Sequence, residues 1–551
     1  MASLKVESPA DIYIPDVPRL LFSSPCFERR GEPGVAAFDL SYHKNTAAQG
    51  WASMRQRQAW HPLHLMADNI AIPSTVLDFP TPEEFHRELE QGYDAVCITF
   101  GAVSTGMLAK MIRHIRRTSP HIPIVVGGYG TDLLDKSDDP LVREIRESVD
   151  EICRGEGVSF LKDFVARRFG ISHDSPFRQD LPLQEFGFGG LPWAISKGLV
   201  LVSALGCKNQ CQFCSTSHHF QGRKTSLSSP ISLCETLVGQ LASHPKSADV
   251  LVYDEDFLAD RDAAMELARL FGAQPTLGAR NVRLTVFASI RSLQQYTIDE
   301  LSALRIGMVF IGIESLTGLA SVDGCARAKR GLEDPAALFQ RLHAAGIHTM
   351  ASVIGGWDGQ SPDELEWEAK RFTALNPTLY QVMPLTALPG TPLWDKHKED
   401  GRFDSDNSWR HPEIWGHRLQ SWIDSTNRML VEEGGPWFFR MAANHLEAVQ
   451  SKLPVRLRSD NEKRLSALEP LALASGFFFR GSGFRNRWKR FTKRRFRSYP
   501  IQSLVRMAFG VLLCAGLWLS HQVVGRIRAM VGATDVPRSV RTPYPGTRAA
   551  T

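Results

Sequence analysis

The chain is short of cysteine, has no apolar run at its N-terminus and carries almost no acid in its last part. Nine cysteines among 551 residues are too few and too irregularly spaced for the disulfide framework of a secreted protein. The first 13 residues contain no h-region of a signal peptide, so we expect a cytoplasmic protein. Residues 471–551 hold 15 Lys/Arg and one acid, Asp535, although the whole chain is only +5. This imbalance predicts contact with an anionic surface, either phospholipid or nucleic acid.

The overall composition is that of a folded protein. Hydrophobic residues make up 43% of the chain, aromatic residues 9% and charged residues 22%, which excludes a disordered, a collagen-like and a polytopic membrane chain. At ~150 residues per domain, the length corresponds to about three or four domains. We expect an enzyme or a large binding protein.

Strands and helices alternate through the first part of the chain, which predicts a parallel, doubly wound sheet. The expected strands lie at 19–25, 74–79, 95–100, 122–126 and 151–153. In such sheets the ligand lies at the carboxyl ends of the strands. The candidate ligand-binding residues there are Gly101, Ser104, Thr105, Gly127, Gly128, Gly155 and Glu156.

A second alternating series predicts a (βα)6 barrel, complete or partial, with its site at the carboxyl ends of its strands. The expected strands lie at 199–203, 250–253, 283–288, 308–313, 349–354 and 379–383. We therefore expect an α/β protein with a Rossmann-like domain over 1–170, a linker over 171–195, a barrel over 196–395, a helical cap over 396–470 and a basic, apolar tail over 471–551.

Three of the nine cysteines, Cys207, Cys211 and Cys214, form a C-x3-C-x2-C run directly after the first expected barrel strand. Three thiolates on one tight loop can bind three irons of a [4Fe-4S] cluster and leave the fourth iron open to a substrate or cofactor. Two other interpretations remain: a zinc site completed by His218 or His219, and three unrelated buried cysteines. The other six cysteines lack ligand spacing, and we expect them to pack as small apolar residues.

With Phe213 before the third cysteine, this loop resembles that of the radical S-adenosylmethionine (SAM) superfamily. Further matching segments follow the later strands: Gly222-Arg223, Asp254-Glu-Asp-Phe257, Arg291, Ile311-Gly-Ile-Glu-Ser315, Gly355-Gly356 and the 385–393 segment. The resemblance implies that the open iron chelates the amino and carboxylate groups of SAM.

The same resemblance suggests SAM contacts along the strand ends. Glu255 or Asp256 would accept from the ammonium and Arg291 would pair with the carboxylate. Glu314 would accept from the ribose hydroxyls or the ammonium, and Gly355 would let backbone approach the adenine. The family's usual Gly-Gly-Glu is replaced by an Asp-Glu-Asp run here, which leaves open which acid contacts SAM.

The first domain resembles the cobalamin-binding domain of B12-dependent radical SAM enzymes. The resemblance lies in the segments 94–101, 104–105, 124–128 and 155–157. The Asp-x-His-x-x-Gly motif that supplies a histidine to cobalt in other B12 proteins is absent, so we predict cobalamin binding without that ligand. The alternative is a doubly wound domain that only docks on the barrel and shields the radical.

Together these features resemble the class B cobalamin-dependent radical SAM methyltransferases. The resemblance implies that SAM is used twice, with methylation of an unactivated carbon, and that a flavodoxin- or ferredoxin-type protein supplies electrons. A radical SAM oxidative cyclase or rearrangement enzyme without methyl transfer is one alternative. A non-catalytic, membrane-associated iron–sulfur protein is the other.

The tail combines two unusual segments. Nine Lys/Arg with interleaved aromatic residues occupy 480–497, and 507–524 has no formal charge. The pair favours attachment to the cytoplasmic membrane, peripheral or anchored, over nucleic-acid binding, because RNA contacts need no apolar run. A buried core helix with a solvated basic face is the remaining alternative. The substrate is expected to be a small or lipid-like molecule.

Overall fold

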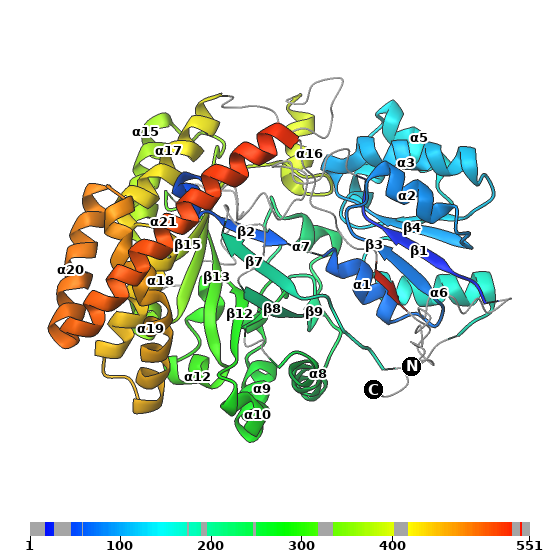
Figure 1. The fold of residues 1–551 in the computed structure, drawn as a ribbon. Helices are drawn as coiled ribbons and strands as arrows, with labels where there is room; N and C mark the ends of the chain where they lie inside the picture. Colours follow the sequence, from blue (N-terminus) through cyan, green and yellow to red (C-terminus); the bar gives the residue numbers. More distant parts are fainter. Residues whose placement is uncertain are drawn as a thin grey trace.

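The computed structural model describes residues 17–26, 46–57, 59–172, 176–188, 196–245, 249–317, 334–401, 417–531 and 540–542. Two sheets with helices around them form the centre of the structure, and five helices from the C-terminal part pack at one side (Figure 1). Both expected α/β units are present.

Sheet A is the doubly wound unit. Its parallel strands follow the order β3-β1-β4-β5-β6, and β16 pairs antiparallel with β3 at the edge. Their bounds are β1 (Leu20–Ser23), β3 (Ser74–Leu77), β4 (Ala95–Thr99), β5 (Ile124–Gly127), β6 (Glu151–Ile152) and β16 (Val540–Thr542). From β1 the chain continues to β3 on one side, and from β4 it continues to β5 on the other side. The carboxyl ends of β1 and β4 therefore border the crevice in which such sheets bind ligands.

Helices cover both faces of sheet A because its strands are apolar on both sides. Leu20 and Phe22 of β1 pack with α1 and α6, whereas Leu21 packs in a separate core with α2, α3 and α5. The helices are α1 (His61–Asp68), α2 (Pro82–Leu89), α3 (Thr105–Thr118), α4 (Thr131–Lys136), α5 (Pro140–Ser148) and α6 (Gly157–Phe169). This two-sided burial is the pattern of a parallel sheet.

Sheet B contains six parallel strands in chain order and is an open half-barrel. They are β8 (Ser196–Leu201), β11 (Asp249–Val252), β12 (Arg283–Ala288), β13 (Ile306–Glu314), β14 (His348–Gly355) and β15 (Leu379–Pro384). Each overlaps an expected strand, so the partial (βα)6 barrel is confirmed. The main flanking helices are α8 (Pro230–Ser243), α9 (Arg261–Ala273), α12 (Ile298–Ala303), α14 (Pro335–Ala344), α15 (Pro362–Ala374) and α16 (Pro392–Glu399).

Several short elements complete the two units. They are the 3-10 turns η3 (Ala47–Ala52), η4 (Ala102–Ser104) and η5 (Phe257–Ala259), and the helices α7 (Ser215–His219), α10 (Pro275–Ala279) and α11 (Ile290–Leu293). Helices α2, α12 and α15 begin at capping boxes, in which a Thr or Ser and the Glu three residues later each bond the other's backbone. That signature is visible in sequence.

Two strands of sheet B come from segments that we assigned outside the barrel. Strand β7 (Gln184–Phe188) lies in the expected linker, and β2 (Met54–Arg57) lies in the expected first domain. They pair antiparallel with each other, with Met54 opposite Phe188. Strand β7 also pairs antiparallel with β8 and so joins both strands to the barrel sheet. Pairing between segments so far apart leaves no local signal in sequence.

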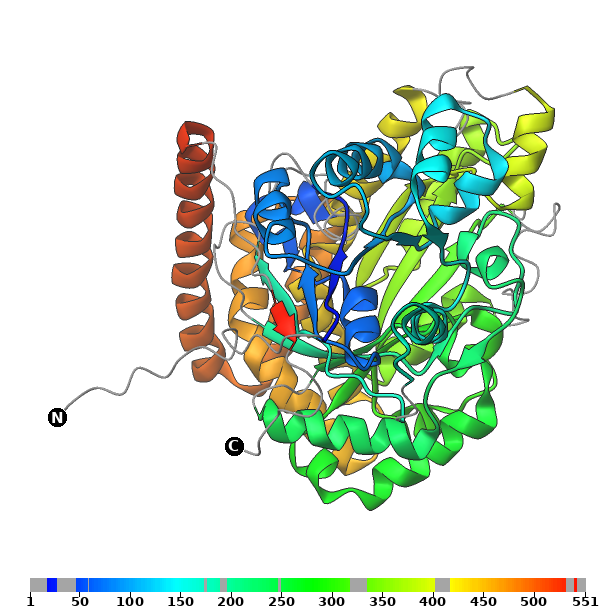
Figure 2. The same cartoon turned by 90° about the vertical axis from the view of Figure 1, so that its right-hand side faces the viewer.

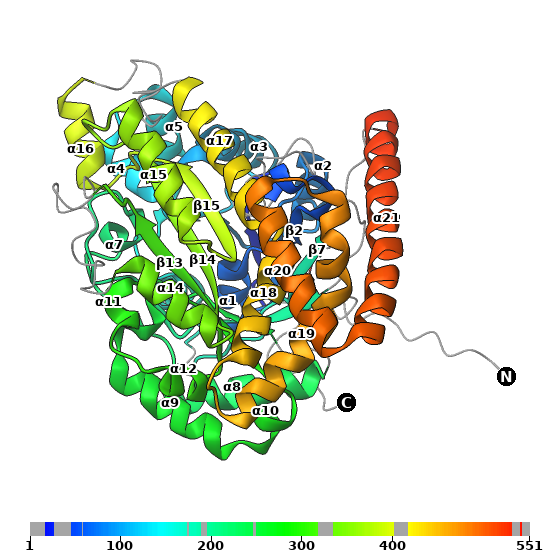
Figure 3. The same cartoon turned by 90° about the vertical axis from the view of Figure 1, so that its left-hand side faces the viewer.

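The C-terminal part, residues 417–531, consists of helices joined by short connections. Its elements are α17 (His417–Gly434), α18 (Trp437–Gln450), α19 (Val455–Phe478), α20 (Ser482–Ser498) and α21 (Pro500–Val531). Helix α19 contains Pro470 and runs across the boundary that we expected at residue 470. Figure 3 shows α19 and α20 side by side with α21 along the margin.

Candidate functional site

The three cysteines lie in one loop, residues 206–224, which we call the cluster loop. Strand β9 (Ala204–Leu205) pairs antiparallel with β10 (Thr225–Ser226) and closes the loop at its base. Gly206 begins the loop with φ +84°, and a Cβ there would lie 2.2 Å from the carbonyl oxygen of Arg223. Only glycine fits this position, because both the left-handed backbone and the close approach exclude a side chain.

Backbone hydrogen bonds hold the cysteine segment in its turn. The hydroxyl of Ser217 donates to the carbonyl of Cys207 at 2.7 Å and accepts from the N–H of Gln210 at 2.9 Å. The N–H of Cys214 donates to the carbonyl of Cys211 at 3.0 Å. Cys207 and Cys211 are buried and Cys214 is half-buried. The loop therefore presents three thiols from a fixed backbone.

The histidines that a zinc site would need are engaged elsewhere. Nε2 of His218 lies 3.1 Å from the carbonyl oxygen of Cys211, and the ring of His219 bonds residues of the other domain. Within the described ranges, no three His, Cys, Asp or Glu side chains form a group that could hold a metal ion. A zinc ion needs its ligands around one point, whereas an iron–sulfur cluster takes each thiolate on a different iron. Both ring nitrogens of His219 are already engaged, so this histidine is not free to bind zinc in the described conformation.

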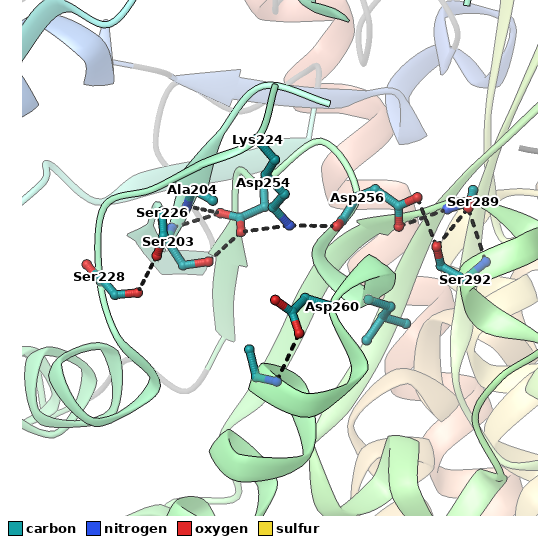
Figure 4. A network of polar contacts seen from close by, with 12 residues as sticks. Ser203, Ala204, Lys224, Ser226, Ser228, Asp254, Asp256, Asp260, Ser289 and Ser292 are labelled. Carbon is teal, nitrogen blue, oxygen red and sulfur yellow. Dashed lines mark hydrogen bonds and ion pairs between the residues drawn. The ribbon is translucent and has the colours of Figure 1, made fainter. Parts of the chain in front are cut away.

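Asp254, at the end of β11, ties both ends of the cluster loop to the barrel (Figure 4). Its Oδ1 accepts from the N–H of Ser203 at 2.8 Å and from that of Ala204 at 3.1 Å, and its Oδ2 accepts from the Ser203 hydroxyl. Nζ of Lys224 lies 3.9 Å from the same carboxylate. Burial raises the pKa of Asp254, while these hydrogen bonds and Lys224 act against the rise. Sequence reasoning missed this anchoring role.

The next two acids are in different environments. The carboxylate of buried Asp256 accepts from the hydroxyl of Ser292 at 2.9 Å and from the N–H of Ser289 at 3.4 Å (Figure 4). By contrast, Oε2 of Glu255 is buried without a hydrogen-bond partner among the described residues. Burial, with the adjacent Asp254, raises the pKa of Glu255 to about 7. An unpartnered buried carboxylate oxygen is a place for a cationic ligand.

The remaining SAM-contact candidates stand at the carboxyl ends of barrel strands. Arg291 on α11 is exposed and has no ion-pair partner among the described side chains. Buried Glu314 ends β13 with φ 61°, where the pairing with β14 shifts register; strained backbone of this kind clusters at functional sites. At Gly355 a Cβ would lie 2.5 Å from the ring of Trp422, so packing against α17 by itself requires a glycine there.

His219, at the end of α7, joins the cluster loop to the doubly wound domain. Its Nδ1 lies 3.1 Å from Oδ1 of Asp132, and the N–H of Gly155 donates to its Nε2 at 3.2 Å. Because Nε2 accepts, Nδ1 carries the hydrogen and donates to Asp132. The side chain of His219 is only 2% exposed. The contact brings the glycine-rich edge of sheet A against the cluster loop.

Tyr129, after β5, lines the same interface. Its ring lies 5.1 Å from that of His219, and its hydroxyl accepts from Oγ1 of Thr216 at 3.2 Å. Burial raises the pKa of Tyr129, and the nearby Glu255 and Cys214 raise it further. The residue is nevertheless 41% exposed. Tyr129 was not among the residues predicted from the sequence.

The glycines at the edge of sheet A fall into two groups. At Gly127 a Cβ would lie 3.3 Å from Cβ of Cys153, and at Gly128, with φ +90°, it would lie 2.6 Å from Oγ1 of Thr99. Packing therefore explains these two. At Gly101 and Gly155, no atom of the described residues beyond the chain neighbours lies within 4 Å of the Cβ position, so open space adjoins the backbone where a ligand was expected.

The polar candidates beside them bond to their own loops. The hydroxyl of Ser104 donates to the carbonyl of Gly101 at 2.8 Å, and that of Thr105 donates to the carbonyl of Ala102 at 2.6 Å. Glu156 caps α6 by accepting from the N–H groups of residues 158 and 159. These contacts shape the edge and give each side chain a structural role.

The other described cysteines behave as expected for small apolar residues. They are buried, take part in no disulfide, and are Cys26, Cys97, Cys153, Cys234 and Cys514. Burial raises the pKa of each of these thiols. Cys325 lies outside the described residues.

Comparison with solved structures identifies the architecture. The radical S-adenosylmethionine methyltransferase TsrM from Kitasatospora setae, solved with cobalamin and a [4Fe-4S] cluster bound, superposes with a TM-score of 0.56 at 14% identity. The match covers 82% of this chain and 99% of TsrM. This chain has the fold of that methyltransferase. A second TsrM structure, with tryptophan substrate and the SAM analogue aza-SAM bound, gives a TM-score of 0.55 at 15% identity, with the same coverage.

Sequence comparison finds similarity to a protein that is also described as a methylase. The hopanoid C-2 methylase of Rhodopseudomonas palustris (strain TIE-1) is 25% identical over 205 residues, which are 37% of this chain and 38% of the methylase. The chain thus matches well under half the length of this relative. No family model matches the chain. The expected resemblance to B12-dependent radical SAM methyltransferases is confirmed, as a resemblance in fold, by the TsrM structures, and the sequence match is to a methylase.

Proposed function

We propose that this chain is a radical SAM enzyme that carries a [4Fe-4S] cluster on Cys207, Cys211 and Cys214, binds cobalamin at the carboxyl edge of sheet A and methylates an unactivated carbon. The observation that carries the proposal is the His219 contact with Asp132 and Gly155. It sets the cysteine loop against the edge of sheet A, so that the two proposed cofactor sites adjoin.

The residues present fit both cofactors. Three thiols share one fixed loop, Oε2 of Glu255 has no hydrogen-bond partner among the described residues, and the backbone at Gly101 and Gly155 borders open space in the described structure. When bound, the cluster supplies the electron that cleaves SAM, and cobalamin carries the methyl group. The arrangement supports a two-cofactor enzyme.

The protein side chains would bind and orient SAM. We assign the ammonium of SAM to Glu255, its carboxylate to Arg291 and its ribose hydroxyls to Glu314. Asp256 has a positioning role, because Ser289 and Ser292 already occupy its carboxylate. Backbone at Gly355 remains the proposed adenine contact, while Trp422 fills the space beside its Cα.

The polar residues along sheet A would act mainly through the backbone. Ser104, Thr105 and Glu156 hold the loops around Gly101 and Gly155 in shape, and Gly127 and Gly128 let those loops pack closely. The backbone along this edge would hold cobalamin, and Tyr129 lines the same interface with the cluster loop. The sequence contains no Asp-x-His-x-x-Gly motif, so no histidine of that motif would bind the cobalt.

For the surroundings we propose a cytoplasmic enzyme that receives electrons from a flavodoxin- or ferredoxin-type protein and acts on a small, lipid-like substrate. The similarity to a hopanoid methylase over 205 residues supports an apolar substrate. The low cysteine content and the free buried thiols suit a reducing compartment.

The test is anaerobic purification with hydroxocobalamin supplied, followed by iron, sulfide and corrinoid analysis of one sample. The wild type is compared with a Cys207→Ala/Cys211→Ala/Cys214→Ala variant and, as a matched control, with Cys97→Ala/Cys234→Ala. We expect about four irons and one corrinoid per wild-type chain, with iron lost in the triple variant alone. Incubation with reductant should yield S-adenosylhomocysteine and 5′-deoxyadenosine.

A second variant tests the corrinoid site separately. Gly101 has an extended backbone, φ −108° and ψ 161°, and empty space beside it, so Gly101→Leu should fold normally. Its side chain would fill the proposed cobalamin space, and we expect corrinoid to be lost while iron is retained. Iron without corrinoid in the wild type would refute methyl transfer and leave a cyclase or rearrangement enzyme. Zinc in place of iron would refute the whole proposal, and a cluster without SAM cleavage would indicate a non-catalytic protein.

A further inference from the structure

Helix α21 is fixed to the molecule along one face. Glu469 of α19 is fully buried, and its carboxylate accepts from Nε of Arg495 at 2.9 Å and from Arg506 of α21. Farther along, a Cβ on Gly510 would meet the carbonyl oxygen of Pro470, so the two helices pack in close contact. Cys514 of α21 joins the same core. Detaching α21 would break a buried ion cluster, which is costly.

The opposite face of α21 is apolar and exposed. The Pro500–Ser520 part of α21 is long and apolar enough to cross a membrane, and only 22% of its apolar stretch is buried. Figure 2 shows α21 as a separate rod along the margin of the molecule. We call this side the outer face; its residues, between 56% and 77% exposed, are Ile501, Leu504, Val505, Phe509, Leu512 and Leu519. A contiguous apolar patch of this kind marks an interaction site.

The neighbouring helix α20 supplies positive charge. It leads into α21 through Tyr499 and packs against it. Its exposed cations, which we call the basic stripe, are Arg485, Lys489, Arg490, Lys493, Arg494 and Arg497. No acid occurs between residues 470 and 534. Cations beside an apolar helix face match an anionic lipid surface, where headgroups take the charges and acyl chains take the side chains.

Two exposed aromatic residues, one between α20 and α21 and one on α21, support the same partner. Tyr499, where α21 begins, is 42% exposed, and Trp518, near the end of its described side chains, is 48% exposed. Such amphipathic rings favour the boundary between headgroups and acyl chains. A second copy of the chain would bring one basic stripe against another, which charge repulsion opposes.

We propose that the outer face of α21 and the basic stripe of α20 bind the surface of an anionic lipid bilayer, with α21 lying in the plane of the membrane. The anchoring of its inner face through Glu469 and Arg506 keeps α21 against the protein, so it lies on the bilayer and does not cross it. This inference is independent of the cluster and of cobalamin, and it would bring the enzyme to the compartment where lipid-like molecules concentrate.

The experiment is flotation of the full-length protein with phosphatidylcholine vesicles, with and without phosphatidylglycerol. We expect binding only to the anionic vesicles, and weaker binding as salt rises. Phe509→Glu/Leu512→Glu should lower vesicle affinity at least tenfold, and Lys489→Glu/Lys493→Glu should remove the preference for anionic lipid. Ile231→Glu is the matched control, because Ile231 is 54% exposed on α8; it should bind like the wild type. Circular dichroism and thermal unfolding check that each variant folds.

Four results would overturn the proposal. The wild type would stay with the soluble fraction, or the Ile231→Glu control would weaken binding as much as the outer-face variant does. Alternatively, light scattering would find a dimer that Phe509→Glu/Leu512→Glu converts to monomer, which would assign the outer face to a second copy. Binding of single-stranded RNA in place of vesicles would assign the basic stripe to nucleic acid. None of these results affects the iron and corrinoid analysis, so the two proposals fail separately.

Discussion

Glu255→Gln should stabilise the cluster-free protein at pH 8 and leave its stability almost unchanged at pH 5. Burial raises the pKa of Glu255 from its usual 4.5 to about 7, so the folded protein holds this proton more tightly than the unfolded chain. Below pH 4.5 Glu255 is therefore protonated in both states and does not lower the free energy of unfolding, and the destabilisation grows as the pH rises to about 7. Glutamine keeps the shape of the side chain without the charge.

The size of the effect follows from the pKa difference. At about 1.4 kcal/mol per pKa unit, the full shift corresponds to about 3 kcal/mol, and partial exposure of the side chain reduces this to about 2 kcal/mol. A gain of that size raises the melting temperature of a domain the size of the barrel by about 4–8 °C. The same substitution should abolish SAM binding, because the ammonium loses its proposed acceptor.

The assay is thermal unfolding of wild type and variant from pH 5 to pH 8, with calorimetry of SAM binding to the reconstituted protein. Asp256→Asn is the control: its carboxylate already accepts from Ser289 and Ser292, so this variant should be less stable at every pH. A melting-temperature difference for Glu255→Gln that stays constant or falls with rising pH would refute the reasoning.

Three further outcomes are expected. Gly206→Ala should lose iron and melt well below Gly92→Ala: both glycines have positive φ, but only Gly206 has backbone within 3 Å of its Cβ position. Equal iron contents and melting points would contradict this. His219→Phe should weaken the contact between the two domains by about 2 kcal/mol. We expect faster proteolysis between the domains and about tenfold weaker corrinoid binding. An unchanged proteolysis rate and corrinoid affinity would show that His219 does not position the two domains. Arg440→Met should lower the urea midpoint by the equivalent of about 3 kcal/mol, because the buried guanidinium donates to three backbone carbonyls that would lose their hydrogen bonds. An unchanged midpoint would show that water replaces the guanidinium.

Much of the architecture was predictable because its signals are local. Each barrel strand is a short apolar run followed by polar or glycine residues, and this pattern located all six parallel strands. The three cysteines of the cluster loop can be recognised from their spacing within one short segment. The two faces of sheet A follow from alternation within β1, where Leu20 and Phe22 oppose Leu21.

Several of the predicted site residues acquired a definite role only in three dimensions. Glu255 and Asp256 are adjacent and chemically alike, yet one has an unpartnered oxygen and the other is fully bonded. Gly101 and Gly128 are both glycines at one sheet edge, yet only the first borders open space. Burial and hydrogen bonding depend on neighbours from other elements, and no spacing rule contains them.

By itself, the sequence determined the doubly wound domain, the half-barrel, the cysteine loop and the basic, apolar tail. The tertiary structure decided that β2 and β7 extend the barrel sheet, that Asp254 and Lys224 anchor the loop, and that α21 is held by one face and open on the other. It also set His219 against Asp132, 87 positions away in the chain. The physical reason is range: periodicity and loop spacing act over a few residues, whereas packing joins segments whose separation in sequence carries no pattern.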